Sequence, residues 1–340
     1  MTNAGAPSWI HPAKLFASLV AGYAASVLFS VLISRMGAQT SSIWTATGFL
    51  VGALILLSGR WRIAAVTACL GFQAALSLAA GDGLARALVN LPVNLLEAGL
   101  AAWLAVTFCG VRRRRLSLRQ LSLLLIAAIA PAAMLAAVFG AAANFALQGQ
   151  GFIDGWLAWA VPSGLGMALV TPAVLLVSRE SQYKEFRRSQ IETVGLLCGV
   201  CALTAAVFWQ SELPLQFVIF PALTLIALRL GPPGAAIAGG FVAVICLSLA
   251  MLGHGPAMLA AALDPLGRVR LTQVVVTAAL CTTLATATLA AERSRLQRLL
   301  ISRDRAVRAA RLRARTAEWL AADAIGQRQS ATTRRGAHAA

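Results

Sequence analysis

The sequence predicts an all-α fold, a polytopic integral membrane bundle of about ten transmembrane helices. Hydrophobic residues make up 59% of the 340 residues and charged residues 12%, whereas soluble domains are about half apolar and about a quarter charged. Apolar runs of roughly 17–25 residues, the length of a membrane-spanning helix, fill residues 14–291. These runs lack the alternation of a barrel strand, and backbone in lipid must satisfy its own hydrogen bonds. We therefore expect helices and not a barrel.

Ten apolar segments are long enough to be considered as spans. In order they are residues 14–34, 43–58, 62–80, 84–108, 120–142, 156–178, 191–209, 213–229, 233–253 and 271–291. The second segment is short, and the linkers after the second and eighth segments are tight. Those two pairs fit re-entrant or tilted hairpins as well as full spans, so eight full crossings is the alternative count.

The distribution of arginine predicts that both termini are cytoplasmic. With residues 1–13 as a cytoplasmic tail, the inner loops hold Arg60 and Arg62, the run Arg112–Arg115, and the basic segment 179–188. Cytoplasmic loops carry the excess of Lys and Arg in membrane proteins. The net charge of +17 is thus explained by topology and contact with anionic lipid, without a nucleic-acid partner. We expect a multi-pass protein of a cell membrane.

The composition changes after Ala291. Residues 292–340 carry 12 arginines and 4 acidic residues, and no proline occurs from Glu292 to Ile325. Alanine, leucine and arginine favour helix, so residues 14–291 are predicted as the membrane domain and residues 292–325 as a cytoplasmic basic helix. The alternative for that helix is an amphipathic helix lying on anionic headgroups. Residues 326–340 are predicted to be disordered.

Polar residues inside the apolar runs are the candidates for function. Asn90, Asn94 and Glu97 lie on one stripe of the fourth predicted span, and Gln73 on the third span is a candidate partner. Ionisable residues in the hydrocarbon are costly and usually face the bundle interior. The stripe therefore predicts a ligand or proton site, with hydrogen bonding between helices as the structural alternative.

The sequence shows no constellation typical of an enzyme. It has three histidines, which are far apart, and neither a glycine-rich phosphate loop nor a G-x-S-x-G motif. Cys198 and Cys201 form an isolated C-x-x-C pair, which we interpret as buried small side chains and not as a metal site. We predict no catalytic residue, no metal and no cofactor.

Several ordered motifs resemble a known bacterial family, the membrane-associated sensor domain, type one (the MASE family). They cover about residues 14–300. In order they are Trp44–Gly48, Gly59–Arg62, Asn94–Glu97, Trp156–Pro172, and Phe220 and Pro221 with Arg229, Gly231 and Gly234. The resemblance adds Trp44, Ser163 and Arg229 to the candidate sensing residues. It also leads us to expect an acidic residue where this chain has Ser163.

The resemblance implies a sensory module that perceives a stimulus in its membrane bundle. Such modules are normally followed by a histidine kinase or by a cyclase or phosphodiesterase of cyclic di-GMP, and the 49 residues after Ala291 are too few for such a domain. The expected partners are the lipid bilayer, a second copy in a homodimer, and a histidine kinase, diguanylate cyclase or membrane transporter. Two alternatives stay open: a small-molecule transporter or channel with a midplane site on the fourth span, and a remnant of a longer sensor enzyme.

Overall fold

The computed structural model describes residues 11–36, 43–81, 84–112, 115–149, 151–260 and 263–337. Within these ranges every regular element is a helix, which confirms the all-α fold class. The chain forms two compact units, Met1–Ala291 and Glu292–Ala340.

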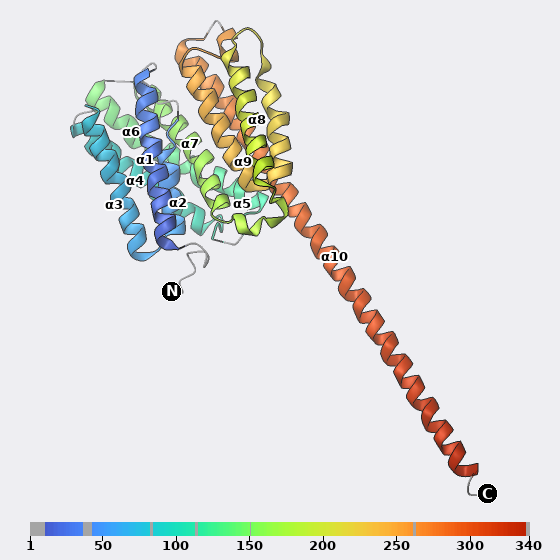
Figure 1. Ribbon diagram of the computed structural model, residues 1–340. Coiled ribbons are helices and arrows are strands. Elements are labelled where there is room, and N and C mark those ends of the chain that lie inside the picture. Colours follow the sequence, from blue (N-terminus) through green and yellow to red (C-terminus); the bar gives the residue numbers. More distant parts are fainter. Residues whose placement is uncertain are drawn as a thin grey trace. The chain divides into compact units, whose positions relative to one another are not determined.

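The first half of the larger unit contains α1 to α7 (Figure 1). Their bounds are α1 Pro12–Met36, α2 Ala46–Leu56, α3 Gly59–Ala79, α4 Leu84–Thr107, α5 Leu118–Leu123, α6 Ala130–Gln148 and α7 Phe152–Val177. A π-helical stretch, Leu124–Ile129, joins α5 to α6. The rings of Phe16 and Trp61 are 5.4 Å apart, so α1 and α3 begin at the same end of the bundle. Ser30, late in α1, donates to the carbonyl of Ile43 just before α2, so α2 runs back in the opposite direction.

The second half contains α8, α9 and the beginning of α10. Their bounds are α8 Gln190–Trp209, α9 Ile219–Met251 and α10 Pro265–Ala337. Short 3₁₀ turns at Glu180–Gln182, Lys184–Phe186, Leu215–Val218 and Pro256–Leu259 connect or precede these helices. Helix α9 packs against both α7 and α8, which joins the two halves.

Helix α9 is broken at Gly231, whose φ of 64° and ψ of −165° are not helical. Before the break, Arg229 reaches Glu192 in the first turn of α8, with Nη1 and Oε1 3.1 Å apart. The break divides α9 into two arms. Just after the end of the second arm, His254 stacks on Trp209 at the other end of α8, with ring centroids 5.0 Å apart. The two arms of α9 are therefore antiparallel, as expected for the separate spans 213–229 and 233–253.

Eight helical stretches among the described residues are long and apolar enough to cross a membrane. This agrees with a polytopic helical membrane protein and equals the lower of the two predicted counts. Helix α2, with 11 residues, is about 16 Å long and cannot cross a core of about 30 Å. The stretch Leu215–Met251 counts once by length, although its arms are antiparallel. Adding α2 and counting both arms restores the ten segments that the sequence predicts.

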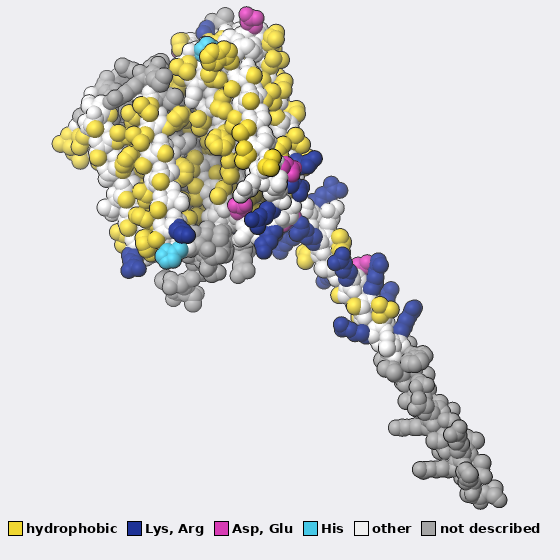
Figure 2. All heavy atoms as spheres, in the orientation of Figure 1, with side chains coloured by type: hydrophobic (Ala, Val, Ile, Leu, Met, Phe, Trp, Pro, Cys, Tyr) yellow, Lys and Arg dark blue, Asp and Glu magenta, His cyan; other side chains and the backbone are white. Residues whose placement is uncertain are grey.

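The surface of the larger unit is that of a protein in lipid. Figure 2 shows hydrophobic side chains over its flanks and many of its Lys and Arg side chains gathered near one end. Ile191 is 87% exposed and Ile126 is 73% exposed, which is expected where lipid replaces water. We call the arginine-rich end the basic end. It comprises the start of α1, the α2–α3 turn, the α4–α5 and α7–α8 loops, and the break in α9.

The smaller unit is the part of α10 that follows Ala291. Its described side chains are almost all exposed, and Asp304 and Arg308 form an ion pair at 2.7 Å. The change of composition after Ala291 coincides with the division between the two units. Helix α10 runs on to Ala337, which differs from the disorder predicted for residues 326–340. Residues 338–340 and the side chains beyond residue 316 lie outside the described part of the chain.

Candidate functional site

Glu97 of α4 is fully buried at the interface with α7. Its side chain is 0% exposed, and the Ser163 hydroxyl lies 2.6 Å from Oε1 and 2.7 Å from Oε2. Ser163 is itself buried and follows Pro162 in the middle of α7. A carboxyl group in the interior of a membrane protein needs a polar partner, and this serine hydroxyl provides one from a neighbouring helix.

The start of α2 completes this junction. The backbone N–H of Trp44 donates to the carbonyl of Pro162 at 3.0 Å, and Thr47, 1% exposed, lies beside the Glu97 carboxyl group. This close approach depends on Gly166, where a Cβ would lie 2.0 Å from the Trp44 carbonyl oxygen. Helices α2, α4 and α7 therefore meet at one buried carboxyl group.

One buried polar atom at the start of α2 has no hydrogen-bond partner among the described residues. It is the Nε1 atom of Trp44. Buried polar atoms of this kind call for an explanation, and a bound water or ligand is one of the usual ones. The Glu97 carboxyl group, bonded to Ser163 and beside Thr47, is the group here that can change its protonation state or its hydrogen-bond partner. Sequence reasoning missed Thr47, although it lies inside the Trp44–Gly48 motif.

The other polar residues of the predicted cluster are only partly brought to this junction. Asn94 is 3% exposed and lies one turn before Glu97, whereas Asn90 is half-buried. Gln73 is also buried, but its Oε1 accepts a hydrogen bond from the Tyr23 hydroxyl of α1. The expected role of Gln73 as a partner of the fourth-span cluster is therefore not seen, because its face of α3 is turned to α1.

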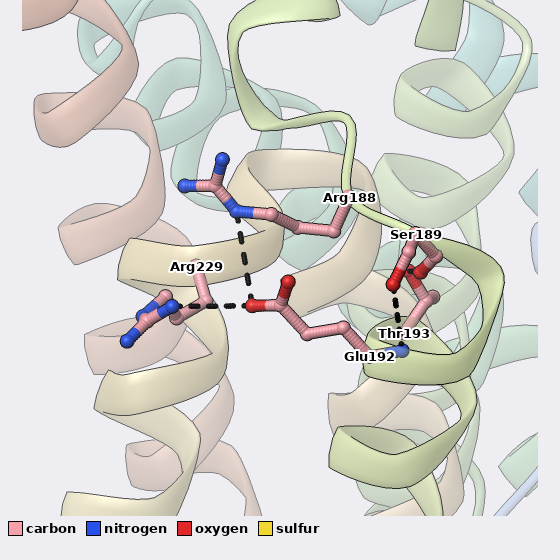
Figure 3. A network of polar contacts seen from close by, with 5 residues as sticks. All are labelled: Arg188, Ser189, Glu192, Thr193 and Arg229. Carbon is pink, nitrogen blue, oxygen red and sulfur yellow. Dashed lines mark hydrogen bonds and ion pairs between the residues drawn. The ribbon is translucent and has the colours of Figure 1, made fainter.

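Arg229 belongs to the basic end and not to the Glu97 junction. It is exposed and pairs with Glu192, which Arg188 also approaches at 3.9 Å (Figure 3). Ser189 caps the same turn of α8 by accepting from the Glu192 N–H at 3.1 Å. Exposed ion pairs stabilise by only about 0–1 kcal/mol, so this network contributes little to the packing of α8 against α9.

A second buried cluster lies in the α7–α8 loop at the basic end. Arg179 is 6% exposed and donates to the Val111 carbonyl at 2.6 Å. Arg115 pairs with Glu185 at 2.9 Å and stacks over Tyr183. Burial raises the pKa of Tyr183 above its ordinary value, although Arg115 and Arg179 oppose this shift. Phe186 fills the space at Gly231, where a Cβ would lie 2.4 Å from its ring.

The α7–α8 loop thus connects the α4–α5 loop to the break in α9. From the sequence, the basic residues of this segment predicted only a cytoplasmic loop. Which of them are buried could not be predicted, because loops have no periodicity that identifies buried residues. Burial also lowers the pKa of Arg179. Among the residues that the structure describes, no three His, Cys, Asp or Glu side chains come together as a metal site requires.

A family model, MASE1, matches residues 13–297 of the chain. The chain belongs to the MASE1 family. The match runs from α1 into the part of α10 beyond Ala291 and includes Trp44, Glu97 and Ser163. It confirms the family that the ordered motifs resemble. Comparisons with curated proteins and with solved structures gave no match.

MASE1 domains are membrane sensory modules, so the match supports a sensor role for this chain. It also agrees with the apolar helices in assigning the chain to a membrane as a multi-pass protein.

Proposed function

We propose that this MASE1 chain senses a stimulus at the Glu97–Ser163 junction and passes it through α10 to a partner in the cytoplasm. The observation that carries the proposal is a fully buried carboxyl group held by a hydroxyl from another helix. In a low-dielectric interior, a change in the charge or partner of such a group changes the energy of the surrounding packing strongly. A proton or small polar ligand acting there shifts the balance between arrangements of α2, α4 and α7.

Helix α10 is the proposed route to the partner. Before Ala291, its residues Val276, Leu280 and Leu284 belong to the buried core. Beyond Ala291, Leu296, Leu299 and Leu300 are 61%, 51% and 67% exposed. An exposed apolar stripe on a helix outside the membrane domain favours association with another protein. The partner we propose is a second copy of the chain, a histidine kinase, a diguanylate cyclase or a membrane transporter, in two-component or cyclic di-GMP signalling.

The orientation completes the proposal. The basic end faces the cytoplasm of a bacterial inner membrane, which places both termini inside, because Lys and Arg are concentrated in cytoplasmic loops. Under this arrangement the C-terminal residues are on the side of the membrane where those partners act.

The test is photo-crosslinking of the full chain in native membranes. A photoreactive residue at Leu299 should give an adduct with a second copy or a partner protein, and Glu97→Gln should change its yield. The matched control is the same probe at Arg308, which lies on the opposite face of the helix at 100° per residue. Equal labelling from the two positions, or a yield unaffected by Glu97→Gln, would contradict the proposal.

A second candidate function is a small-molecule transporter or channel. Midplane substrate sites of transporters also join polar groups from several helices, and the Glu97 junction joins three. Uptake of a substrate into proteoliposomes that is lost in Glu97→Gln would favour this function over sensing. Retained crosslinking from Leu299 without any uptake would favour the sensor.

A further inference from the structure

A cavity of about 140 Å³ lies between the end of α9 and the start of α10. Its walls include Ala250, Met251, Met258, Leu266 and Val269, with Arg268 as the charged residue among the described residues that line it. The cavity is at the end of the bundle opposite the basic end, because Gly253 and His254 follow directly on the second arm of α9. It is therefore separate from both the Glu97 junction and the α7–α8 loop.

The guanidinium group of Arg268 is poorly satisfied by the protein. Its Nε is buried and has no hydrogen-bond partner among the described residues. Its Nη1 lies 3.4 Å from the sulfur of Met258, and a thioether is a weak acceptor. The acid one turn earlier, Asp264, instead accepts from the backbone N–H of Gly267 at 2.8 Å. No ion pair of Arg268 occurs within the described part of the chain.

The chemistry of the cavity defines the ligand that complements it. The buried Nε–H of Arg268 lacks an acceptor in the described part of the chain, and a positively charged donor in that state favours an anion. The apolar walls favour a hydrocarbon body on the ligand. One cation with these walls and this volume suits a small molecule with a single negative charge.

We propose that this cavity binds a short-chain monocarboxylate. The carboxylate accepts hydrogen bonds from the Arg268 guanidinium, and the alkyl chain contacts Met251, Leu266 and Val269. The cavity adjoins the first turn of α10, the helix that runs on beyond Ala291. Under the proposed function, a ligand bound there is a second stimulus that acts on α10. The binding itself depends on neither the relay nor the Glu97 junction.

The test is equilibrium binding of radiolabelled butyrate to the full chain in lipid nanodiscs. Saturable binding is expected, with competition by unlabelled butyrate and little by butyramide, which has a similar shape but no charge. Arg268→Gln should weaken binding at least about tenfold, because a charge-assisted hydrogen bond is lost. Arg270→Gln removes an equal charge from outside the cavity lining and should leave binding unchanged.

A second variant separates loss of the site from loss of the fold. Val269→Phe fills the cavity while retaining Arg268, and it should also abolish butyrate binding. Thermal unfolding like that of the wild type shows that the fold is kept in this variant. The proposal is overturned by absence of saturable butyrate binding to the wild type, by equal competition from butyramide, or by wild-type binding in Val269→Phe. A negative result here leaves the crosslinking test at Leu299 unaffected, so the two proposals fail separately.

Discussion

Replacing Ser163 by alanine should destabilise the membrane bundle because it removes the hydroxyl that faces both oxygens of Glu97. Those distances are 2.6 and 2.7 Å, and the carboxyl group is 0% exposed, so water cannot substitute for the hydroxyl without rearrangement. Hydrogen bonds between membrane helices contribute about 0.6 kcal/mol on average and up to about 1.7 kcal/mol. Bonds to a charged group contribute about 1.5–3 kcal/mol. We expect Ser163→Ala to lower the free energy of unfolding by about 1–2 kcal/mol.

The measurement is reversible unfolding of the purified chain in mixed micelles of mild detergent and dodecyl sulfate. The matched control is Ser178→Ala, since Ser178 is a buried serine at the end of the same helix. Its hydroxyl donates to the Leu175 carbonyl of the same helix at 3.0 Å and bonds to no second helix among the described residues, so its removal should cost clearly less.

A double-mutant cycle with Glu97→Gln tests the pairing directly. The Glu97→Gln substitution mainly removes the ability to carry a charge, because glutamine keeps the shape of the side chain and one acceptor oxygen. If the wild-type carboxyl group is ionised, Ser163→Ala should cost less in the Glu97→Gln background than in the wild type. A cost of Ser163→Ala no larger than that of Ser178→Ala would refute the reasoning that this hydroxyl holds α7 to α4.

Three further predictions concern the break in α9, the α7–α8 loop and the orientation. Gly231→Ala should lower the free energy of unfolding by about 2–4 kcal/mol, because it adds backbone strain and a Cβ that would lie 2.4 Å from the Phe186 ring. The control is Gly199→Ala, whose Cβ would have no described atom within 4 Å. It should be neutral or stabilising in the same unfolding assay. Burial raises the pKa of Tyr183 from its ordinary value of 10.0. Its contribution to stability is therefore present below pH 10 and is lost as the pH rises above that value. Thermal unfolding of Tyr183→Phe should be less sensitive to alkaline pH than that of the wild type, and identical pH profiles would contradict this. Reporter fusions after residues 115, 188 and 315 should all report cytoplasm, and an external signal at any of them would break the orientation.

The sequence predicted the membrane segments well because span length and hydropathy are local properties. The short second segment and the tight linker before Gly234 both appear in the structure, as α2 and as the break at Gly231. The Glu97 stripe was recognisable because an acid in an apolar run is costly. Ser163 entered the candidate set through the family motifs, and the structure brings it to the same carboxyl group.

Contacts between helices were harder to predict. Helix α2 is apolar on every side, so its pattern does not show which face meets α7, and Thr47 was missed for this reason. Gln73 turned to Tyr23 because the rotation of α3 is set by packing and not by a polar stripe. In the tail, Gly326 suggested an end to the helix, but one glycine costs only about 1 kcal/mol within a helix, and α10 runs past it.

The shortness of α2 limits how its neighbourhood can move. Residues 43–45 precede its first turn as non-helical backbone, and the Trp44 amide depends on the Pro162 carbonyl of α7. Irregular backbone is tolerated at membrane depth only where protein covers it or water reaches it. If α2 and α7 moved apart by about the length of one hydrogen bond, the Trp44 amide would lose its acceptor and would need a water molecule in its place. A gradual separation of α2 and α7 is therefore disfavoured. We expect this contact to be either closed and free of water or open and hydrated.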